Sequence, residues 1–182
     1  MELRARKSSG LRTALILLTA AAVPARAKLA PPPDRRPALE LSAGVSGIFD
    51  EGTRPMRYGA EFFWRPVTPW LVTPGLGLAY TEGGASFVFA ELRRDFWLDP
   101  RLVVSISLGG GLFHEDGGLH LGNEIEFRSG LALSRRFGDQ LRIGIGFVHV
   151  SNGGLSESNP GTEALDLLIH FPLGSARAAA AN

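Results

Sequence analysis

Hydrophobic and polar residues alternate with a period of two along most of the chain after residue 38. Near the start of this region, Leu39 and Leu41 alternate with Glu40 and Ser42. Successive side chains of a β-strand point to opposite faces of a sheet, so this period indicates strands with one apolar and one polar face. No sustained helical period follows in the rest of the sequence. The pattern therefore predicts an all-β protein.

The alternation recurs in eight separate stretches, which predicts eight strands. They lie at about 39–46, 56–64, 75–80, 86–97, 102–112, 124–134, 141–148 and 165–171. In the fourth stretch the alternation is set by Phe87 and Phe89 and changes phase near Glu91, which suggests a β-bulge. Eight alternating strands of this length fit a small transmembrane β-barrel. A soluble sandwich or a lipocalin-like barrel is the alternative, and in either of these the apolar face would point inward.

The composition of the two faces favours the membrane barrel. One face carries Gly, Ser and charged residues, and the other carries Leu, Ile, Val, Phe and Trp. Small and paired charged side chains can fill the narrow lumen of an eight-stranded barrel, whereas large apolar side chains would overfill it. We therefore predict an eight-stranded antiparallel transmembrane β-barrel of the outer membrane. The charged residues expected to form a network in its lumen are Glu124, Glu126, Arg128, Arg142, Asp166 and His170.

The segment before the strands has the pattern of an export signal. A basic start is followed by the apolar run 13–23 and by Ala25-Arg26-Ala27, which fits a small-x-small cleavage site. The apolar run is too short for a transmembrane helix, which needs about 20 residues. We expect a signal peptide over 1–27, a Pro-rich periplasmic linker over 28–37, the barrel over 38–173 and an Ala-rich tail over 174–182.

Charge and cysteine content exclude two other classes. The formal net charge is +1, with 19 basic and 18 acidic residues, and this balance argues against a nucleic-acid-binding protein. The chain has no cysteine, so a disulfide framework is also excluded.

Connection lengths predict the orientation of the barrel. The second, fourth and sixth connections, at 66–69, 98–100 and 138–140, are expected to be short, and the odd-numbered ones longer. Outer-membrane barrels keep their short turns in the periplasm and their long loops outside. Trp64, Trp70 and Trp97 fall beside the short turns, where they suit an aromatic girdle.

Three residues near the C-terminus form a candidate catalytic triad. His149 and Ser151 are two apart on one strand, and so share a face. Glu163 begins the next strand after a loop rich in Gly, Ser and Asn, and in a hairpin it would return to the side of His149. A nucleophile, a base and an orienting carboxylate are the elements of acyl transfer. All three share the parity of the apolar face, so we expect them to face lipid at the height of the outer leaflet.

The segment 147–163 resembles the lipid A 3-O-deacylases of the PagL type. These are eight-stranded outer-membrane barrels with a His-x-Ser-Asn motif and a glutamate fourteen residues after the histidine, as at His149, Ser151, Asn152 and Glu163. The resemblance implies Ser151 as nucleophile, His149 as base and Glu163 as the group that orients the base. It also implies that Asn159 and the backbone of Gly154 form the oxyanion hole. One departure is the Ala-rich tail, because such barrels usually end on an aromatic residue of the last strand.

The expected activity is removal of the 3-O-linked acyl chain from the lipid A of lipopolysaccharide, without a metal or another cofactor. The acyl chain would lie along the outer wall of the sixth to eighth strands, where the expected contacts are Phe127, Leu131, Ile145 and Phe147. Arg54 and Arg57 are expected in an outer loop, in reach of the substrate phosphates. Besides substrate and outer-membrane lipids, the sequence leaves open whether the barrel pairs as a homodimer.

Two other functions stay open on the sequence alone. An outer-membrane phospholipase would need the same apolar groove, and a small structural or adhesin barrel would need no triad. The loop that contains His114, Glu115, Asp116 and His120 could be taken for a metal site. The spacing of these residues matches no usual ligand pattern, so we expect a solvated loop.

Overall fold

The structure is a computed structural model that describes residues 35–174 apart from 51, 53, 68, 69, 117, 118, 139 and 140. The predicted signal peptide, residues 28–34 of the predicted linker and residues 175–182 of the predicted tail lie outside this part of the chain. No helix within the described residues is long and apolar enough to cross a membrane.

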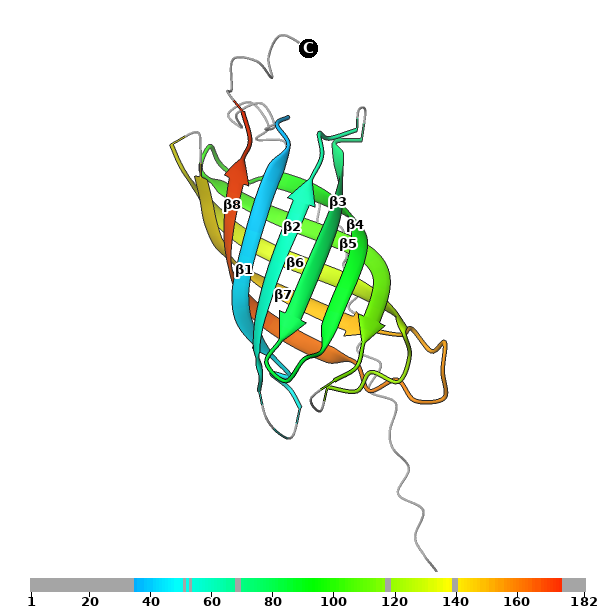
Figure 1. Ribbon diagram of the computed structural model, residues 1–182. Coiled ribbons are helices and arrows are strands. Elements are labelled where there is room, and N and C mark those ends of the chain that lie inside the picture. The colour runs from blue at the N-terminus through cyan, green and yellow to red at the C-terminus, as the bar shows by residue number, and fades with distance from the viewer. Residues whose placement is uncertain are drawn as a thin grey trace, which may run out of the picture.

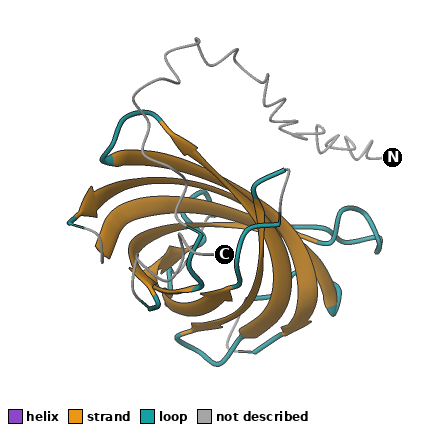
Figure 2. Cartoon of the chain, turned by 90° about the horizontal axis from the view of Figure 1, so that it is seen from above, coloured by secondary structure: helices purple, strands orange, loops and turns teal. Residues whose placement is uncertain are grey.

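Eight antiparallel strands form a closed barrel, as the alternation predicted (Figures 1 and 2). Each strand pairs with its neighbours in sequence, and the first and last strands pair with each other to close the ring. The strands are β1 (Ala38–Ser46), β2 (Met56–Phe63), β3 (Val72–Thr81), β4 (Ser86–Trp97), β5 (Leu102–His114), β6 (Ile125–Phe137), β7 (Leu141–Ser151) and β8 (Thr162–Pro172). No strand is left with an open edge.

The apolar face of the barrel points outward, as predicted. On β8, Leu165 and Leu167 are 47% and 64% exposed, whereas Asp166 and Leu168 between and beside them are buried. The same alternation leaves large apolar side chains of all eight strands on the outer wall. A continuous apolar outer wall is what a barrel needs when it is surrounded by lipid.

The lumen is filled by two kinds of side chain. A charged network occupies its middle and one end in two bonded groups: Arg128 with Glu61 and Glu91, and Arg93 with Glu40, Asp95, Arg142 and His170. Separately, Arg57 is paired with Asp166. Nearer the other end lies an apolar cluster that includes Phe87, Phe89 and Phe113. The barrel is therefore packed through its interior rather than hollow.

The predicted bulge near Glu91 is wrong. The register of β4 against both neighbours runs without interruption from Ser86 to Arg94 on one side and to Trp97 on the other. Phe87, Phe89 and Glu91 all point into the lumen, so the apparent change of phase came from aromatic residues on the inner face. Phe89 fits there because it faces glycines, and a Cβ at Gly77 would lie 2.4 Å from its ring.

Two charged residues are not where the sequence analysis expected them. Glu124 precedes β6 and is exposed, so it does not belong to the lumen network. Arg57 lies on the inner face of β2 and is buried against Asp166, so it cannot reach a ligand from an outer loop. Glu126 does point inward and is fully buried, but neither carboxylate oxygen has a hydrogen-bond partner among the described residues.

The two ends of the barrel differ in their connections. Connections β2–β3, β4–β5 and β6–β7 lie at what we call the short-turn end, at the top of Figure 1. Connections β1–β2 (47–55), β5–β6 (115–124) and β7–β8 (152–161) lie at the opposite, long-loop end. Two expectations differ: the β3–β4 connection at this end spans only 82–85, as short as the β4–β5 connection opposite (98–101), and the β2–β3 connection at the short-turn end spans 64–71. Trp64, Trp70 and Trp97 lie at the short-turn end, as expected for a girdle.

Adjacent residues of β8 offer a direct check on which face meets lipid. The native chain has no cysteine, so Leu167→Cys and Leu168→Cys each introduce a single thiol. We expect a lipid-soluble maleimide to label the folded Leu167→Cys barrel and to leave Leu168→Cys unlabelled, because only the first side chain is on the outer wall. Equal labelling after unfolding is the control. Labelling of Leu168→Cys alone would contradict the outward apolar face.

Candidate active site

The three candidate catalytic residues meet on the outer wall at the long-loop end of β7 and β8. His149 and Ser151 lie on β7, and His149 is paired in register with Glu163 on β8. Side chains of directly opposed residues in an antiparallel pair lie close enough to interact. The period of two and the hairpin together therefore bring the three side chains to one place, as the sequence predicted.

Hydrogen bonds join the three side chains in a chain. His149 Nδ1 is 2.9 Å from Glu163 Oε1, and His149 Nε2 is 3.1 Å from Ser151 Oγ. An ionised carboxylate can only accept, so Nδ1 carries the hydrogen and the Ser151 hydroxyl donates to Nε2. This is the arrangement in which a histidine can take the proton of a serine nucleophile. The His149 side chain is 39% exposed and the Glu163 side chain 22% exposed, so an outside molecule can reach them.

Gly161 lets the β7–β8 connection pass close to the triad. It has a φ of +64° and is buried, and a Cβ at this position would lie 3.3 Å from His149 Cε1. Glycine adopts this backbone conformation without the steric cost that other residues carry. The connection can therefore return to β8 close beside the imidazole ring.

Asn152, the residue after Ser151, anchors the β7–β8 connection. Its side chain is fully buried, and its Nδ2 donates to the carbonyls of Leu121 and Ser158 at 3.1 and 2.8 Å. Its backbone N–H donates to Asn159 Oδ1 at 3.0 Å. Because Asn159 accepts through Oδ1, its Nδ2 remains oriented as a donor on the other side of the amide. The sequence could not show this anchor, since Leu121 belongs to a different loop.

Gly154 lies beside this anchor. Its backbone N–H donates to Asn152 Oδ1 at 2.9 Å, so in this structure the amide already has an acceptor. Gly154 also has a positive φ of 89°, which places it in a tight turn that a Cβ would strain. To serve as an oxyanion donor, the Gly154 amide must share its hydrogen or turn away from Asn152.

The four residues expected to contact an acyl chain line the outer wall below the triad. Phe127 is paired with Ser151, and Leu131 with Phe147. Phe127, Leu131 and Ile145 are each about half exposed, at 48%, 48% and 53%. Phe147 is partly covered by Phe49 of the β1–β2 connection, with the ring centroids 6.2 Å apart. Together they form an apolar surface that leads up to the serine.

The sequence analysis missed one polar neighbour of the triad. Ser129 on β6 is paired in register with His149 and shares its outward face. The signal was present in the sequence, because Ser129 is a polar residue in the outward phase between Phe127 and Leu131. Polar groups on the lipid-facing wall are costly unless they lie near the interface or serve a function.

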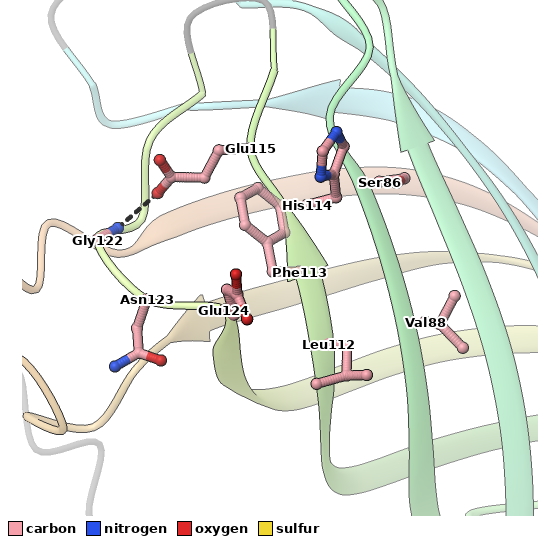
Figure 3. Close-up of a pocket in the computed structure, with 9 residues that line it drawn as sticks. All are labelled: Ser86, Val88, Leu112, Phe113, His114, Glu115, Gly122, Asn123 and Glu124. Atoms are coloured by element: carbon pink, nitrogen blue, oxygen red, sulfur yellow. Dashed lines mark hydrogen bonds between the residues drawn. The ribbon is translucent and has the colours of Figure 1, made fainter.

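A separate hollow of about 620 Å³ lies on another part of the wall, at the long-loop ends of β4 and β5 (Figure 3). It is lined by Ser86, Val88, Leu112, Phe113, His114, Glu115, Gly122, Asn123 and Glu124. The triad lies outside it, open on β7 and β8.

Two of the loop residues considered as a metal site, Glu115 and His120, are bonded to each other, and Glu115 is also bonded to the loop backbone. Glu115 accepts hydrogen bonds from the amides of Gly122 and Leu121 at 2.8 Å and from His120 at 3.1 Å. These hydrogen bonds hold the pKa of the Glu115 carboxyl below its ordinary value, and the bond from the Gly122 amide contributes most. Within the described residues, no group of three His, Cys, Asp or Glu side chains is placed to hold a metal ion.

Comparison with known protein families gives a match over most of the chain. Residues 56–172 match the profile of the family described as lipid A 3-O-deacylase (PagL). This range includes all three candidate catalytic residues and the four residues of the apolar surface. No curated protein sequence matches the chain.

Solved structures with the same fold are outer-membrane and designed barrels. The chain is similar to the outer membrane enzyme PagL, with a TM-score of 0.59 and 21% identity over 75% of this chain and 99% of that one. It is also similar to Neisserial surface protein A, with a TM-score of 0.57 and 8% identity over 75% and 96% of the two chains. A designed transmembrane β-barrel gives a TM-score of 0.51 and 12% identity over 75% and 95%. At these identities the likenesses establish the fold.

Proposed function

Because the chain belongs to the lipid A 3-O-deacylase (PagL) family, we propose that Ser151, His149 and Glu163 hydrolyse the 3-O-linked acyl ester of lipid A. The family is one of carboxylic ester hydrolases, and the chain is an enzyme of this class, integral to the outer membrane. The observation that carries the proposed mechanism is the pair of hydrogen bonds at His149, which accepts from Ser151 at 3.1 Å and donates to Glu163 at 2.9 Å.

The reaction would proceed through an acyl-serine. Ser151 Oγ attacks the ester carbonyl carbon while its proton passes to His149 Nε2. The tetrahedral intermediate then collapses, the bond to the sugar 3-oxygen breaks, and His149 returns the proton to that oxygen. A water molecule, activated by the same imidazole, next attacks the acyl-serine and releases the fatty acid. Throughout, Glu163 keeps the hydrogen on Nδ1 and stabilises the imidazolium.

The negative charge that develops on the carbonyl oxygen needs hydrogen-bond donors. Asn159 Nδ2 is a suitable donor, because the Asn152 amide fixes the orientation of the Asn159 side chain. The Gly154 amide is the second, provided that it leaves or shares its bond to Asn152 Oδ1. A donor of this kind typically contributes about 3 kcal/mol to the transition state. In this proposal Asn152 is a positioning residue for the other two.

The site would act from within the membrane. If the short-turn end faces the periplasm, as is usual for such barrels, the triad lies at the level of the outer leaflet. Its outward side chains then meet only molecules that reside in that leaflet. The acyl chain would pack on Phe127, Leu131, Ile145 and Phe147, whose exposed surface runs from the triad toward the middle of the barrel wall.

The substrate can be distinguished from an ordinary phospholipid by a direct comparison. Apolar contacts on the barrel wall hold any acyl chain, so selectivity has to come from the loops above the triad. We expect the purified barrel in detergent to release one 3-hydroxy fatty acid from each lipid A and to leave phosphatidylethanolamine intact. Free fatty acid is followed by mass spectrometry, with the Ser151→Ala barrel as the blank. Similar release of fatty acid from both lipids would favour a phospholipase. Release from neither lipid would favour a structural barrel.

A further inference from the structure

Four arginines gather at the short-turn end of β4, β5 and β6. Arg94 and Arg135 lie on the outward faces of β4 and β6, Arg101 lies in the β4–β5 connection, and Arg136 follows Arg135. The Arg136 N–H donates to the Arg101 carbonyl at 2.7 Å, so these two residues are direct neighbours. We call the four residues the arginine cluster. Arg94 and Arg135 point to the outside of the barrel, whereas Arg136 has the inward parity of β6 and lies at the rim beside Trp97.

The nearby carboxylates are engaged elsewhere. Asp95 points inward and binds Arg93 and Arg142 in the lumen, at 2.9 and 2.6 Å. Asp99 accepts hydrogen bonds from the backbone amides of Arg101 and Leu102, at 2.6 and 2.9 Å. Within the described residues, Asp99 is the one carboxylate beside the four arginines that is not bound in the lumen, so this part of the surface carries more positive than negative charge and suits an anionic partner.

Aromatic rings hold three of the four guanidinium groups. Arg94 lies over Phe96 at 5.1 Å from the ring centroid, and Arg135 lies over Phe137 at 5.9 Å. The Arg136 guanidinium lies 5.6 Å from the Trp97 ring centroid. A guanidinium held against a ring still presents N–H groups at its edge, and these match the oxygens of a phosphate. The rings therefore hold the cations in place without using their hydrogen-bonding capacity.

The position of the arginine cluster along the barrel fits a lipid headgroup. On β4 the outward residue before Arg94 is Leu92, and on β6 the one before Arg135 is Leu133; these leucines are 57% and 43% exposed. Beyond the arginines, Phe96 and Phe137 follow on the same outward faces, so the arginines lie between the leucines of the wall and the aromatic residues at this end. In a bilayer the boundary between apolar and polar protein surface lies at the level of the lipid phosphates, where long basic side chains extend their heads to the interface.

We propose that the arginine cluster binds the phosphate groups of anionic glycerophospholipids in the leaflet opposite the triad. The arginines bind the phosphate, while Leu92 and Leu133 contact the first part of the acyl chains. A free phosphate ion would gain only the first of these contacts. The proposal rests on the proposed membrane orientation for the choice of leaflet, but not on the chemistry of Ser151.

Lipid retention by the purified barrel tests the proposal. The barrel in neutral detergent is titrated with phosphatidylglycerol or phosphatidylcholine, and native mass spectrometry measures the bound lipid. We expect tighter binding of phosphatidylglycerol, and a loss of roughly fivefold for each arginine removed in Arg94→Gln, Arg135→Gln and the double variant. Arg65→Gln is the matched control, because Arg65 is exposed at the same end in the β2–β3 connection and should leave binding unchanged.

Further variants distinguish the contribution of positive charge from that of the planar guanidinium group. The Arg94→Lys/Arg135→Lys barrel keeps the charge but loses the planar group, and should bind phosphatidylglycerol more weakly than the native barrel but better than the double Gln variant. Cold electrophoresis in detergent confirms that each variant is folded. Native affinity for phosphatidylglycerol in the double Gln variant would overturn the proposal, and so would its displacement by an equal concentration of inorganic phosphate. Deacylation, assayed in parallel, should be unaffected, so a failure of either proposal can be recognised separately.

Discussion

The Ser151→Ala barrel is expected to fold and to lose lipid A deacylation by about 10⁵-fold or more, because the nucleophile of the acyl-transfer step is gone. Ser151 is a partly exposed side chain on the outer wall, so its loss should cost little stability. Folding is followed by the heat-dependent shift on electrophoresis, and activity by release of fatty acid from lipid A. Activity within tenfold of the native rate would remove Ser151 as the nucleophile.

Companion variants test whether the three residues act as a unit. His149→Ala should lose about as much activity as Ser151→Ala, and the double variant should lose no more than either one, because the first change already abolishes the shared step. Glu163→Gln should lose roughly 10⁴-fold, since the amide can present the wrong group to Nδ1. Ser129→Ala is the matched control, because Ser129 lies beside His149 without a hydrogen bond to the triad in this structure. Additive losses in the double variant would argue against a triad.

Replacing Arg128 with Met is expected to destabilise the barrel by about 3–5 kcal/mol, because two buried carboxylates would lose their counter-charge. Arg128 lies in the lumen, donates to Glu61 at 3.0 Å and to Ser107 at 3.0 Å, and is also paired with Glu91. The free energy of unfolding is measured in lipid vesicles by urea titration, with tryptophan fluorescence as the signal. Arg54→Met in the exposed β1–β2 connection is the control, for which a change within about 0.5 kcal/mol is expected.

A rescue variant tests the cause of this loss. In Arg128→Met/Glu61→Gln/Glu91→Gln the two carboxylates become neutral, and most of the lost stability should return, because a whole ionic group can often be replaced at little cost. If the triple variant is no more stable than Arg128→Met, the stabilisation comes from packing against Phe89 instead. The Arg128 guanidinium lies 4.7 Å from the centroid of that ring.

The sequence predicted the barrel and the geometry of the triad because both depend on local rules. Parity along a strand determines which face a residue takes, and the pairing of β7 with β8, which are consecutive in sequence, brings His149 and Glu163 together. Neither inference needs knowledge of distant parts of the chain. The catalytic roles of the three residues, and those of Asn159 and Gly154, stay predictions until the variants are measured.

The errors arose where a residue's place depends on partners far away in sequence. Phe89 looks like a lipid-facing residue until Gly77 of β3 and Gly111 of β5 are seen to make room for its ring in the lumen. Arg57 was taken for a loop residue because it is close to a polar connection, yet its partner is Asp166 on β8. The anchoring role of Asn152 depends on Leu121, which is 31 residues away. Alternation alone carries no information on such pairs.

The pairing of β1 with β8 means that the candidate active site is completed late in assembly. Closure joins Ala38 to Pro172, two residues that are almost the whole barrel apart in sequence. Before β8 is in place, β7 and β1 each have an open edge, and Glu163 is absent from beside His149. A chain that is still being threaded across the inner membrane, or that has inserted only in part, therefore lacks the complete triad. In the proposed mechanism, the chain would therefore hydrolyse no ester in the compartments through which it passes until the ring has closed.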